Sequence, residues 1–168
     1  MTHWFPAYVA IGCNVGDCAQ QLRDARIAID ALPDVCCVAG SSVFRTAPVG
    51  KTDQPAFLNA AVGFLTTFAA TTLLDELHRI ERTFGRERSR ETRWGPRTLD
   101  LDLLVYGSQC QQDDALTLPH PRIAERNFVL LPLVEIAPEL EVPGVGGVRQ
   151  LLERCATDGA QRITDFKW

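Results

Sequence analysis

The stretch that decides the fold class is RWGPRTLDLDLLVYG, residues 93–107. It has the alternating pattern of a strand, and two of its residues are carboxylates. Successive side chains of an extended strand point to opposite faces. Alternate leucines from Leu99 onward therefore share one face, and Asp100 and Asp102 share the other. The leucine side chains predict that their face of the strand is buried. The other face brings two like charges within ~7 Å of each other, which raises the pKa of one of them unless a cation intervenes.

Outward from this strand, apolar runs and helical patterns alternate along the chain. We expect strands at residues 7–12, 36–49 and 56–67, helices at residues 18–32 and 72–84, short helices within residues 116–140, and a last helix and strand at residues 148–156 and 162–166. The order strand, helix, strand, strand, helix, strand, followed by a C-terminal extension, predicts an α+β sandwich in which helices cover one mostly antiparallel sheet. The length suits one domain spanning residues 1–168.

The two long predicted helices each show an apolar stripe at helical spacing. The stripes consist of Leu22, Ala25, Ile29 and Leu32 in the first helix and of Leu73, Leu77, Ile80 and Phe84 in the second. Thr72 and Asp75 have the spacing of an N-terminal capping pair for the second helix. Gly85 is expected to end that helix, because glycine readily adopts the left-handed conformation of a helix C-terminus.

The composition of the whole chain predicts a soluble, cytoplasmic protein without a nucleic-acid or membrane partner. The formal net charge is −4. We see no secretory leader pattern and no apolar run of the ~18 residues that a membrane helix needs. The six cysteines include no C-x-x-C pair, so we expect reduced thiols rather than a disulfide framework. The three histidines lie far apart, and no Cys/His group has the spacing of a zinc site.

Seven of the fifteen arginines lie within residues 79–97, where three glutamates oppose them. The planar guanidinium group contacts phosphate oxygens in pairs, which the lysine ammonium group does not. These arginines would neutralise a polyphosphate, while Mg²⁺ held by Asp100 and Asp102 would take phosphate oxygens as further ligands. Trp94 in this loop has little to bury against unless the loop closes, which indicates a mobile lid that excludes water.

Plainer interpretations of these features stay open at this point. The D-x-D pattern alone is more often the solvated acidic face of an edge strand, and RERSRETR at residues 86–93 is compatible with a solvated charged loop. VGKT at residues 49–52 is not a P-loop, because Arg45 stands where that motif requires glycine. GVGG at residues 144–147 lacks the last glycine of a dinucleotide-binding fingerprint, so a hairpin-like turn is expected there.

Several segments, in order along the chain, resemble the 6-hydroxymethyl-7,8-dihydropterin pyrophosphokinase family of folate biosynthesis. They are AIGCNVGD (residues 10–17), SSVFRTAPVG (41–50), DQPAFLNAAV (53–62), RWGPRTLDLDLL (93–104) and LPHPRIAERNFVLLPLVEIAP (118–138). Cys13 stands where the family usually has serine, and the loop from Arg88 to Trp94 is longer than the family's usual spacing. The resemblance implies a ferredoxin-like α/β sandwich. It also implies that ATP gives its β,γ-pyrophosphoryl group to the pterin hydroxymethyl oxygen and leaves AMP.

The resemblance further assigns roles to residues of a site for two small molecules, ATP and the pterin, in a chain that we expect to be a monomer. Asp100 and Asp102 would hold two Mg²⁺ ions. On the nucleotide side the implied residues are Arg86, Arg97, His120 and Arg126 for the phosphates, Arg88 and Trp94 in the lid, and Leu103 and Thr117 beside the adenine. On the pterin side they are Asn59 with the backbone of Thr46, Ala47, Pro48 and Val49 at the ring edge, and Phe57 and Phe128 on the two ring faces.

A purely structural role is the alternative for several of these residues. The two phenylalanines could be core aromatics, Asn59 could satisfy backbone groups at a strand end, and His120 could cap a turn. Glu81, at the edge of the second helix's apolar stripe, either orients an arginine or forms a simple surface ion pair. His78 is expected to be a surface residue of that helix.

Two other functions fit parts of the pattern. A D-x-D nucleotide-sugar transferase also uses a divalent cation on a diphosphate, but it usually needs a larger nucleotide-binding domain than 168 residues supply. A ferredoxin-like module that binds RNA would carry exposed aromatics and spread basic charge on its sheet, whereas the net charge here is −4.

Overall fold

The computed structural model describes residues 2–90, 95–156 and 159–168. Its elements in chain order are β1 (Phe5–Cys13), α1 (Cys18–Asp30), β2 (Val35–Gly40), β3 (Val43–Thr46), β4 (Phe57–Thr66), α2 (Ala70–Thr83), η1 (Arg88–Arg90), β5 (Asp100–Tyr106), β6 (Gln111–Gln112), β7 (Thr117–Leu118), η2 (Ile123–Glu125), α3 (Asn127–Ile136), β8 (Glu141–Val142), β9 (Gly146–Gly147), α4 (Val148–Arg154) and β10 (Ala160–Ile163). Among the described residues, no helix combines the length and apolarity that crossing a membrane requires.

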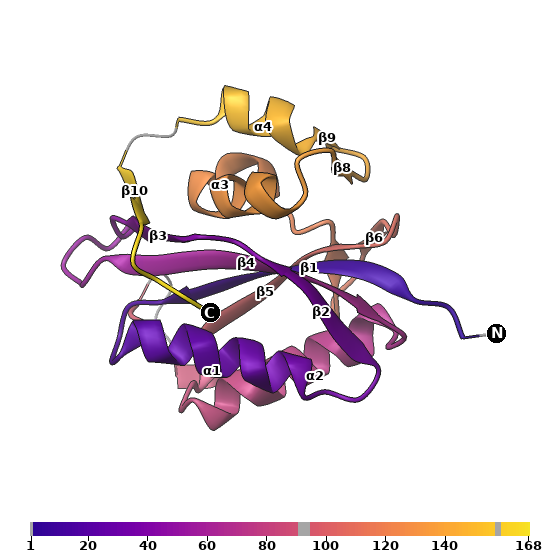
Figure 1. Ribbon diagram of the computed structural model, residues 1–168, viewed down its shortest axis with the longest axis horizontal. Coiled ribbons are helices and arrows are strands. Elements are labelled where there is room, and N and C mark those ends of the chain that lie inside the picture. The colour runs from indigo at the N-terminus through magenta and orange to yellow at the C-terminus, as the bar shows by residue number, and fades with distance from the viewer. Residues whose placement is uncertain (1, 91–94, 157–158) are drawn as a thin grey trace.

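The main sheet has the strand order β10-β3-β4-β1-β5, and β2 also pairs with β4. Every strand pairing in the described part of this sheet is antiparallel. Helices α1 and α2 cover one face, while α3 lies over the other face with α4 beside it (Figure 1). The predicted α+β sandwich of the ferredoxin-like type, with a C-terminal extension, is therefore confirmed.

The alternation of side chains along β1 divides the core between the two faces of the sheet. Ala7, Val9 and Ile11 are at most 1 % exposed and belong to the core beneath α1 and α2. The intervening Tyr8 and Ala10 pack with the apolar residues of α3 and α4. The predicted helix stripes lie in the first of these cores, where they pack against β1 and its neighbours.

The alternation in β5 is the one that the sequence predicts. Leu101 and Leu103 are buried in the core on the side of α1 and α2. Asp100 and Asp102 are only half-buried and lie on the opposite face of the strand. Because β5 pairs only with β1 within the described sheet, the two aspartates stand near one border of that face.

Two predicted boundaries are wrong. The strand expected over residues 36–49 is divided into β2 and β3, because the backbone at Ser41 pairs with Ala61 through its own N–H and its hydroxyl group. The second helix begins at Ala70 rather than Thr72, and its N-cap residue, Ala69, makes no side-chain capping bond. The proposed Thr72–Asp75 capping pair is therefore absent from the helix terminus.

Other local predictions are confirmed. Gly85 follows the end of α2 with φ +79°, the left-handed conformation that favours glycine at a helix C-terminus. The GVGG stretch lies in a hairpin, with Gly144 and Val145 in the turn and Gly146 and Gly147 forming β9, which pairs with β8. The polar segment after Gly107, expected to be a turn alone, also contributes β6 to a short hairpin with β7.

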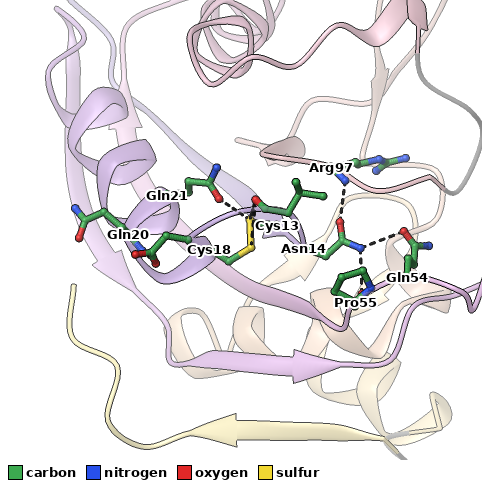
Figure 2. The surroundings of a disulfide bond; sticks show 10 residues. Cys13, Asn14, Cys18, Gln20, Gln21, Gln54, Pro55 and Arg97 are labelled. Atoms are coloured by element: carbon green, nitrogen blue, oxygen red, sulfur yellow. Dashed lines mark hydrogen bonds between the residues drawn. A yellow bond between two sulfur atoms is a disulfide. The ribbon is translucent and has the colours of Figure 1, made fainter.

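The prediction that all cysteines are reduced is wrong for one pair. Cys13 and Cys18 form a disulfide with a Cα–Cα distance of 5.5 Å (Figure 2). The loop between them turns back so that the first residue of α1 lies beside the last residue of β1, within the usual reach of a disulfide. The four other cysteines are free, as expected: Cys36, Cys37, Cys110 and Cys155.

Candidate active site

The two aspartates of β5 are surrounded by guanidinium groups from separate segments. The carboxylate of Asp100 accepts short hydrogen bonds from Arg86, which follows α2, and from Arg97, which precedes β5. The carboxylate oxygen Oδ2 of Asp102 lies 3.4 Å from Nη1 of Arg126, just before α3. The structure therefore brings together an acidic pair and the predicted arginines that stand far apart in sequence.

Glu81 resolves an alternative that the sequence leaves open. Its side chain is 1 % exposed, so it is not part of a surface ion pair. It accepts a hydrogen bond of 2.5 Å from Nη1 of Arg86 and two of 2.7 Å from Arg88. It also accepts the backbone N–H of Leu101 at 2.7 Å, which ties α2 to β5. Glu81 thus orients the two arginines at the base of the arginine-rich loop.

The surroundings shift the pKa values of the two aspartates in opposite directions. Burial alone would raise the pKa of Asp100, but the neighbouring charges of Arg97 and Arg86 outweigh it and hold this pKa below its usual range. Burial and the nearby Asp100 raise the pKa of Asp102 to about 6, although Arg126 opposes this. In the protein alone, ionisation of Asp102 therefore costs free energy that its neighbours do not fully offset.

His120 is fixed in one orientation and one protonation state. Its backbone N–H donates to the carbonyl of Leu104 at 2.8 Å, and its Nδ1 accepts the N–H of Arg122 at 3.2 Å. Burial, together with the charge of Arg126, lowers the pKa of His120 to about 4. The neutral ring therefore carries its proton on Nε2, which lies 3.8 Å from Oδ2 of Asp102. This N–H can donate to an anion bound beside the acidic pair.

A pocket of about 550 Å³, counting the open space at its mouth, adjoins Asp100. The residues that line it come from β1, β3, β4, the β3–β4 loop, β5 with the segment before it, and the start of α3: Gly12, Thr46, Ala47, Val49, Phe57, Asn59, Gly95, Arg97, Asp100, Arg126 and Phe128. The amide of Asn59, which is buried, donates to Oγ1 of Thr46 at 2.7 Å and is held in place by it. Aromatic walls and one fixed amide suit a flat, polar-edged heterocycle.

Gly12 allows the pocket and the acidic pair to meet. It is the cross-strand neighbour of both Asn59 on β4 and Asp100 on β5. A Cβ atom at this position would lie 3.1 Å from Oδ1 of Asn59 and 3.7 Å from Cβ of Asp100. Because glycine has no side chain, the space between Asn59 and Asp100 stays open.

The remaining predicted residues lie around this centre. Arg86 and Arg88 line a second hollow together with Glu81 and His78. Pro48 lies in the β3–β4 loop, and Thr117 is half-buried on β7. The side chain of Leu103 is 4 % exposed in the core on the side of α1 and α2 and lines neither hollow, and its adenine contact stays a prediction. Trp94 lies outside the described residues.

Sequence reasoning missed three residues of the site. His78, expected to be a simple surface residue, lines the second hollow, and burial together with Arg88 lowers its pKa. Asn14 is 4 % exposed and links its loop to Arg97. Gly12 and Asn14 both belong to the AIGCNVGD segment, so the resemblance was the signal that could have identified them.

The acidic pair has the chemistry of a magnesium site. The described residues contain no group of three or more His, Cys, Asp and Glu side chains that could hold a metal ion by themselves. Magnesium in phosphate-transferring sites uses one or two carboxylates and takes its other ligands from water and substrate phosphates. Burial, followed by repulsion from Asp100, raises the pKa of Asp102, and a bound cation would favour its ionised form. The residues present therefore fit Mg²⁺.

Fold and site together define a phosphotransferase, in which paired carboxylates and several guanidinium groups meet beside a pocket for an acceptor. Residues 8–138 match the model of the family described as 7,8-dihydro-6-hydroxymethylpterin-pyrophosphokinase (HPPK), and the chain belongs to this family.

Full-length relatives support the same membership. A 2-amino-4-hydroxy-6-hydroxymethyldihydropteridine pyrophosphokinase of Haemophilus influenzae is 42% identical over 150 residues, which are 89% of this chain and 92% of the relative. A protein of the same name from Methylorubrum extorquens is 43% identical over 94% of this chain and 98% of its own length.

A solved structure supports the fold. Wild-type Plasmodium falciparum HPPK-DHPS with pterin and p-hydroxybenzoate matches 90% of this chain with a TM-score of 0.69 at 13% identity. The chain spans 42% of the length of that two-part protein. At this level of identity the likeness concerns the fold alone.

Proposed function

We propose that the chain catalyses the Mg²⁺-dependent transfer of the β,γ-pyrophosphoryl group of ATP to 6-hydroxymethyl-7,8-dihydropterin, giving AMP and the pterin diphosphate of folate biosynthesis. The observation that carries the proposal is the convergence of Asp100 and Asp102 with three arginines, Arg86, Arg97 and Arg126, next to a pocket that has aromatic walls. Membership of the pyrophosphokinase family supports it.

The pterin occupies the pocket beside Asp100. Phe57 and Phe128 contact its two faces, and the amide of Asn59 reads its edge together with the backbone of residues 46–49. Asn59 already donates one hydrogen bond to Thr46, so its remaining hydrogen-bonding capacity points to the ligand. This arrangement directs the hydroxymethyl group of the pterin toward the acidic pair.

The triphosphate of ATP takes over the guanidinium groups that now pair with the protein's own carboxylates. Arg97 and Arg86 bind Asp100 in the protein alone, and a triphosphate offers them a larger negative charge. Arg126 and the Nε2–H of His120 lie near Oδ2 of Asp102 and are available to the same triphosphate. The groups are therefore in place before the reaction, and they neutralise charge without a large rearrangement.

Asp100 and Asp102 would hold two Mg²⁺ ions, which would supply neutralisation of the phosphate charge. Arg86 and Arg97, which bind Asp100 in the protein alone, would then be available to the triphosphate. The pterin hydroxymethyl oxygen then attacks the β-phosphorus. The bond from that phosphorus to the oxygen bridging the α-phosphate breaks, AMP leaves with this oxygen, and the hydroxyl proton is released.

Arg88 and Trp94 close over the bound substrates as parts of a lid. The guanidinium of Arg88 is partly exposed and is anchored at the buried Glu81, which fits a contact at the base of such a lid. We further propose that residues 1–168 form one domain that acts as a monomer in the cytoplasm. Leu103 and Thr117 border the adenine in this proposal.

The proposal is tested with the variants Asp100→Ala and Asp102→Ala. Each removes a carboxylate that is partly exposed at the site, so we expect both proteins to fold and both to lose metal-dependent turnover by several orders of magnitude. Circular dichroism checks the fold, and turnover is measured across a Mg²⁺ titration. Turnover like that of the unaltered protein in either variant would contradict the assignment.

A further inference from the structure

The Cys13–Cys18 disulfide closes the loop that leads from β1 into α1. Cys13 is fully buried at the end of the strand, and Cys18 is half-buried at the first position of the helix. The residues between Asn14 and Cys18 are exposed. The covalent bond therefore fixes both ends of a loop that is otherwise open to solvent.

Asn14, inside this loop, is a hub between the two halves of the proposed site (Figure 2). Its backbone N–H donates to the carbonyl of Arg97 at 3.0 Å, and its Oδ1 accepts the N–H of Arg97 at 2.8 Å. Its Nδ2 donates to Oε1 of Gln54 and to the carbonyl of Pro55, both at 3.1 Å. One buried amide thus ties the arginine beside Asp100 to the β3–β4 loop, which lines the acceptor pocket.

We propose that the Cys13–Cys18 pair is a reversible thiol–disulfide site that controls how firmly the acceptor pocket is held, through the positioning residue Asn14. The inference rests on the proposed function, because the acceptor side of the pocket is part of that proposal. Disulfides in the cytosol are usually transient and redox-sensing rather than structural. A bond placed next to Asn14 suits such a role.

The reductant is a dithiol, either a small molecule or a protein with a paired-cysteine site. Its thiolate attacks Sγ of Cys18, because Cys13 is fully buried. The protein S–S bond breaks, and the sulfur of Cys13 leaves as a thiolate and takes a proton. The second thiol of the reductant, having lost its proton, then displaces Cys18, which is protonated in turn. The protein gains two electrons and two protons, and the dithiol becomes a disulfide.

Gln21 is placed to receive the new thiol of Cys13. In the disulfide form, Sγ of Cys13 lies 2.9 Å from Oε1 of Gln21, although a disulfide sulfur has no hydrogen to donate. After reduction the S–H group can donate to this oxygen, so Cys13 stays anchored to α1. The Sγ of Cys18 lies 3.8 Å from the carbonyl oxygen of Val15, which belongs to the loop itself, so this contact does not hold the loop to β1 and the loop gains freedom. The hydrogen bonds of Asn14 with Arg97 and Gln54 then act without the covalent restraint on the loop.

The test compares the oxidised chain with the chain reduced by dithiothreitol, with peptide mapping to report the state of the pair. Amide hydrogen exchange measures the N–H groups of Asn14 and Arg97, which does not depend on turnover. Steady-state kinetics measures KM for the pterin and for ATP. We expect faster exchange at both amides and a pterin KM raised about three- to tenfold on reduction, because a less preorganised pocket binds more weakly. The KM for ATP should change little.

Two variants make the test specific. Cys18→Ser should behave like the reduced chain in both buffers, since the pair can no longer form. Cys36→Ser removes an exposed cysteine of β2 that lies outside the pair, so it should keep the full response. A response in Cys18→Ser equal to that of the unaltered chain would overturn the proposal.

The remaining outcomes separate the two proposals. Equal exchange and equal pterin KM in the two states, with mapping proof that the bond has opened, would overturn the thiol–disulfide role while pyrophosphoryl transfer stands. A failure of the pair to form under oxidising conditions would overturn it as well. Exchange that responds to the pair in a chain without any turnover would support the coupling through Asn14 and contradict the proposed function.

Discussion

Asp100 and Asp102 lie on the same face of β5, yet the protein treats their charges differently. Arg86 and Arg97 bind Asp100 and lower its pKa despite burial, whereas burial and the charge of Asp100 raise the pKa of Asp102 to about 6. In the folded protein without metal, the ionised form of Asp100 is therefore stabilised, whereas ionisation of Asp102 destabilises the folded state. Such opposed shifts within one pair are typical of functional sites rather than of structural ion pairs.

The first prediction concerns Asp102→Asn in the metal-free protein. An aspartate whose folded pKa is about 6, against ~3.9 when unfolded, stabilises the folded state below pH ~4. This contribution is lost as the pH rises through 6. Asparagine does not ionise, so the variant does not lose this stability as the pH rises. Its free energy of unfolding at pH 7 should exceed that of the unaltered chain by about 2 kcal/mol. Turnover should disappear.

Denaturant unfolding with a chelator between pH 4 and pH 8 measures this difference. Asp114→Asn changes the net charge equally at an exposed position and serves as the control. A gain in stability that is the same for both variants, or that does not grow between pH 4 and pH 6, would contradict the assigned environment of Asp102.

The second prediction contrasts two glutamates of α2. Glu81→Gln removes the buried charge that pairs with Arg86 and Arg88, and it should lower the free energy of unfolding by about 3 kcal/mol, because buried guanidinium charge loses its partner. Glu76→Gln breaks an exposed pair with Arg79 and should lower it by less than about 1 kcal/mol. Thermal and denaturant melts compare the two. Equal losses would mean that Glu81 is no more than a surface partner.

At the scale of elements, the site depends on how three antiparallel strands are aligned. The register places Gly12 of β1 opposite Asn59 of β4 and Asp100 of β5, so the acceptor pocket and the acidic pair share one floor. A side chain at Gly12 would enter the space between them, at 3.1 Å from Oδ1 of Asn59. The backbone thereby defines how close the acceptor comes to the phosphates.

The third prediction follows from this register. Gly12→Ala should displace Asn59 and raise the KM for the pterin about tenfold, while the loss of stability stays at about 1 to 3 kcal/mol, as is usual for overpacking. Gly63→Ala is the matched control. Its new Cβ would lie 3.2 Å from a ring carbon of Tyr8, in the core rather than the pocket. A pterin KM that changes equally in both variants would show that Gly12 has no special place in the site.

The elements also show what the sequence could and could not predict. The strict alternation of leucine and aspartate in β5 predicted both faces correctly, and the stripe of α1 was buried as expected, because periodicity reports burial directly. The break between β2 and β3 was missed although Gly40, Ser41 and Ser42 interrupt the apolar run there, because the pairing of Ser41 with a distant strand is not visible in the sequence. The disulfide was missed because the closeness of Cys13 and Cys18 depends on a loop turn that no spacing rule describes.

Single side chains of the site were predictable to different degrees. The acidic pair and its arginines stood out by composition and spacing. Glu81 was ambiguous, because a residue at the edge of a helix stripe is buried or exposed according to what packs beside it, here Arg86 and β5. Asn14 gave no signal of its own, since its four hydrogen bonds go to three residues that are distant in sequence, Arg97, Gln54 and Pro55.

At the scale of the whole molecule, positively charged side chains are concentrated beside β5, at one border of the sheet. The chain is acidic overall, with a net charge of −4, yet three arginines of the arginine-rich stretch, Arg86, Arg88 and Arg97, lie next to Asp100. Helices α1 and α2 cover the face of the sheet opposite the two aspartates and support β5 from there (Figure 1). This distribution suits a multiply charged small substrate and gives little reason to expect a nucleic-acid partner.

The measurement that tests the central claim most directly is the identity of the nucleotide product. The chain is incubated with ATP, Mg²⁺ and 6-hydroxymethyl-7,8-dihydropterin, and with each of the three omitted in turn, and the nucleotides are separated by chromatography. The account predicts that AMP forms only when all three are present, in equal amount to the pterin diphosphate. The formation of ADP in place of AMP, or of AMP without the pterin, would contradict it.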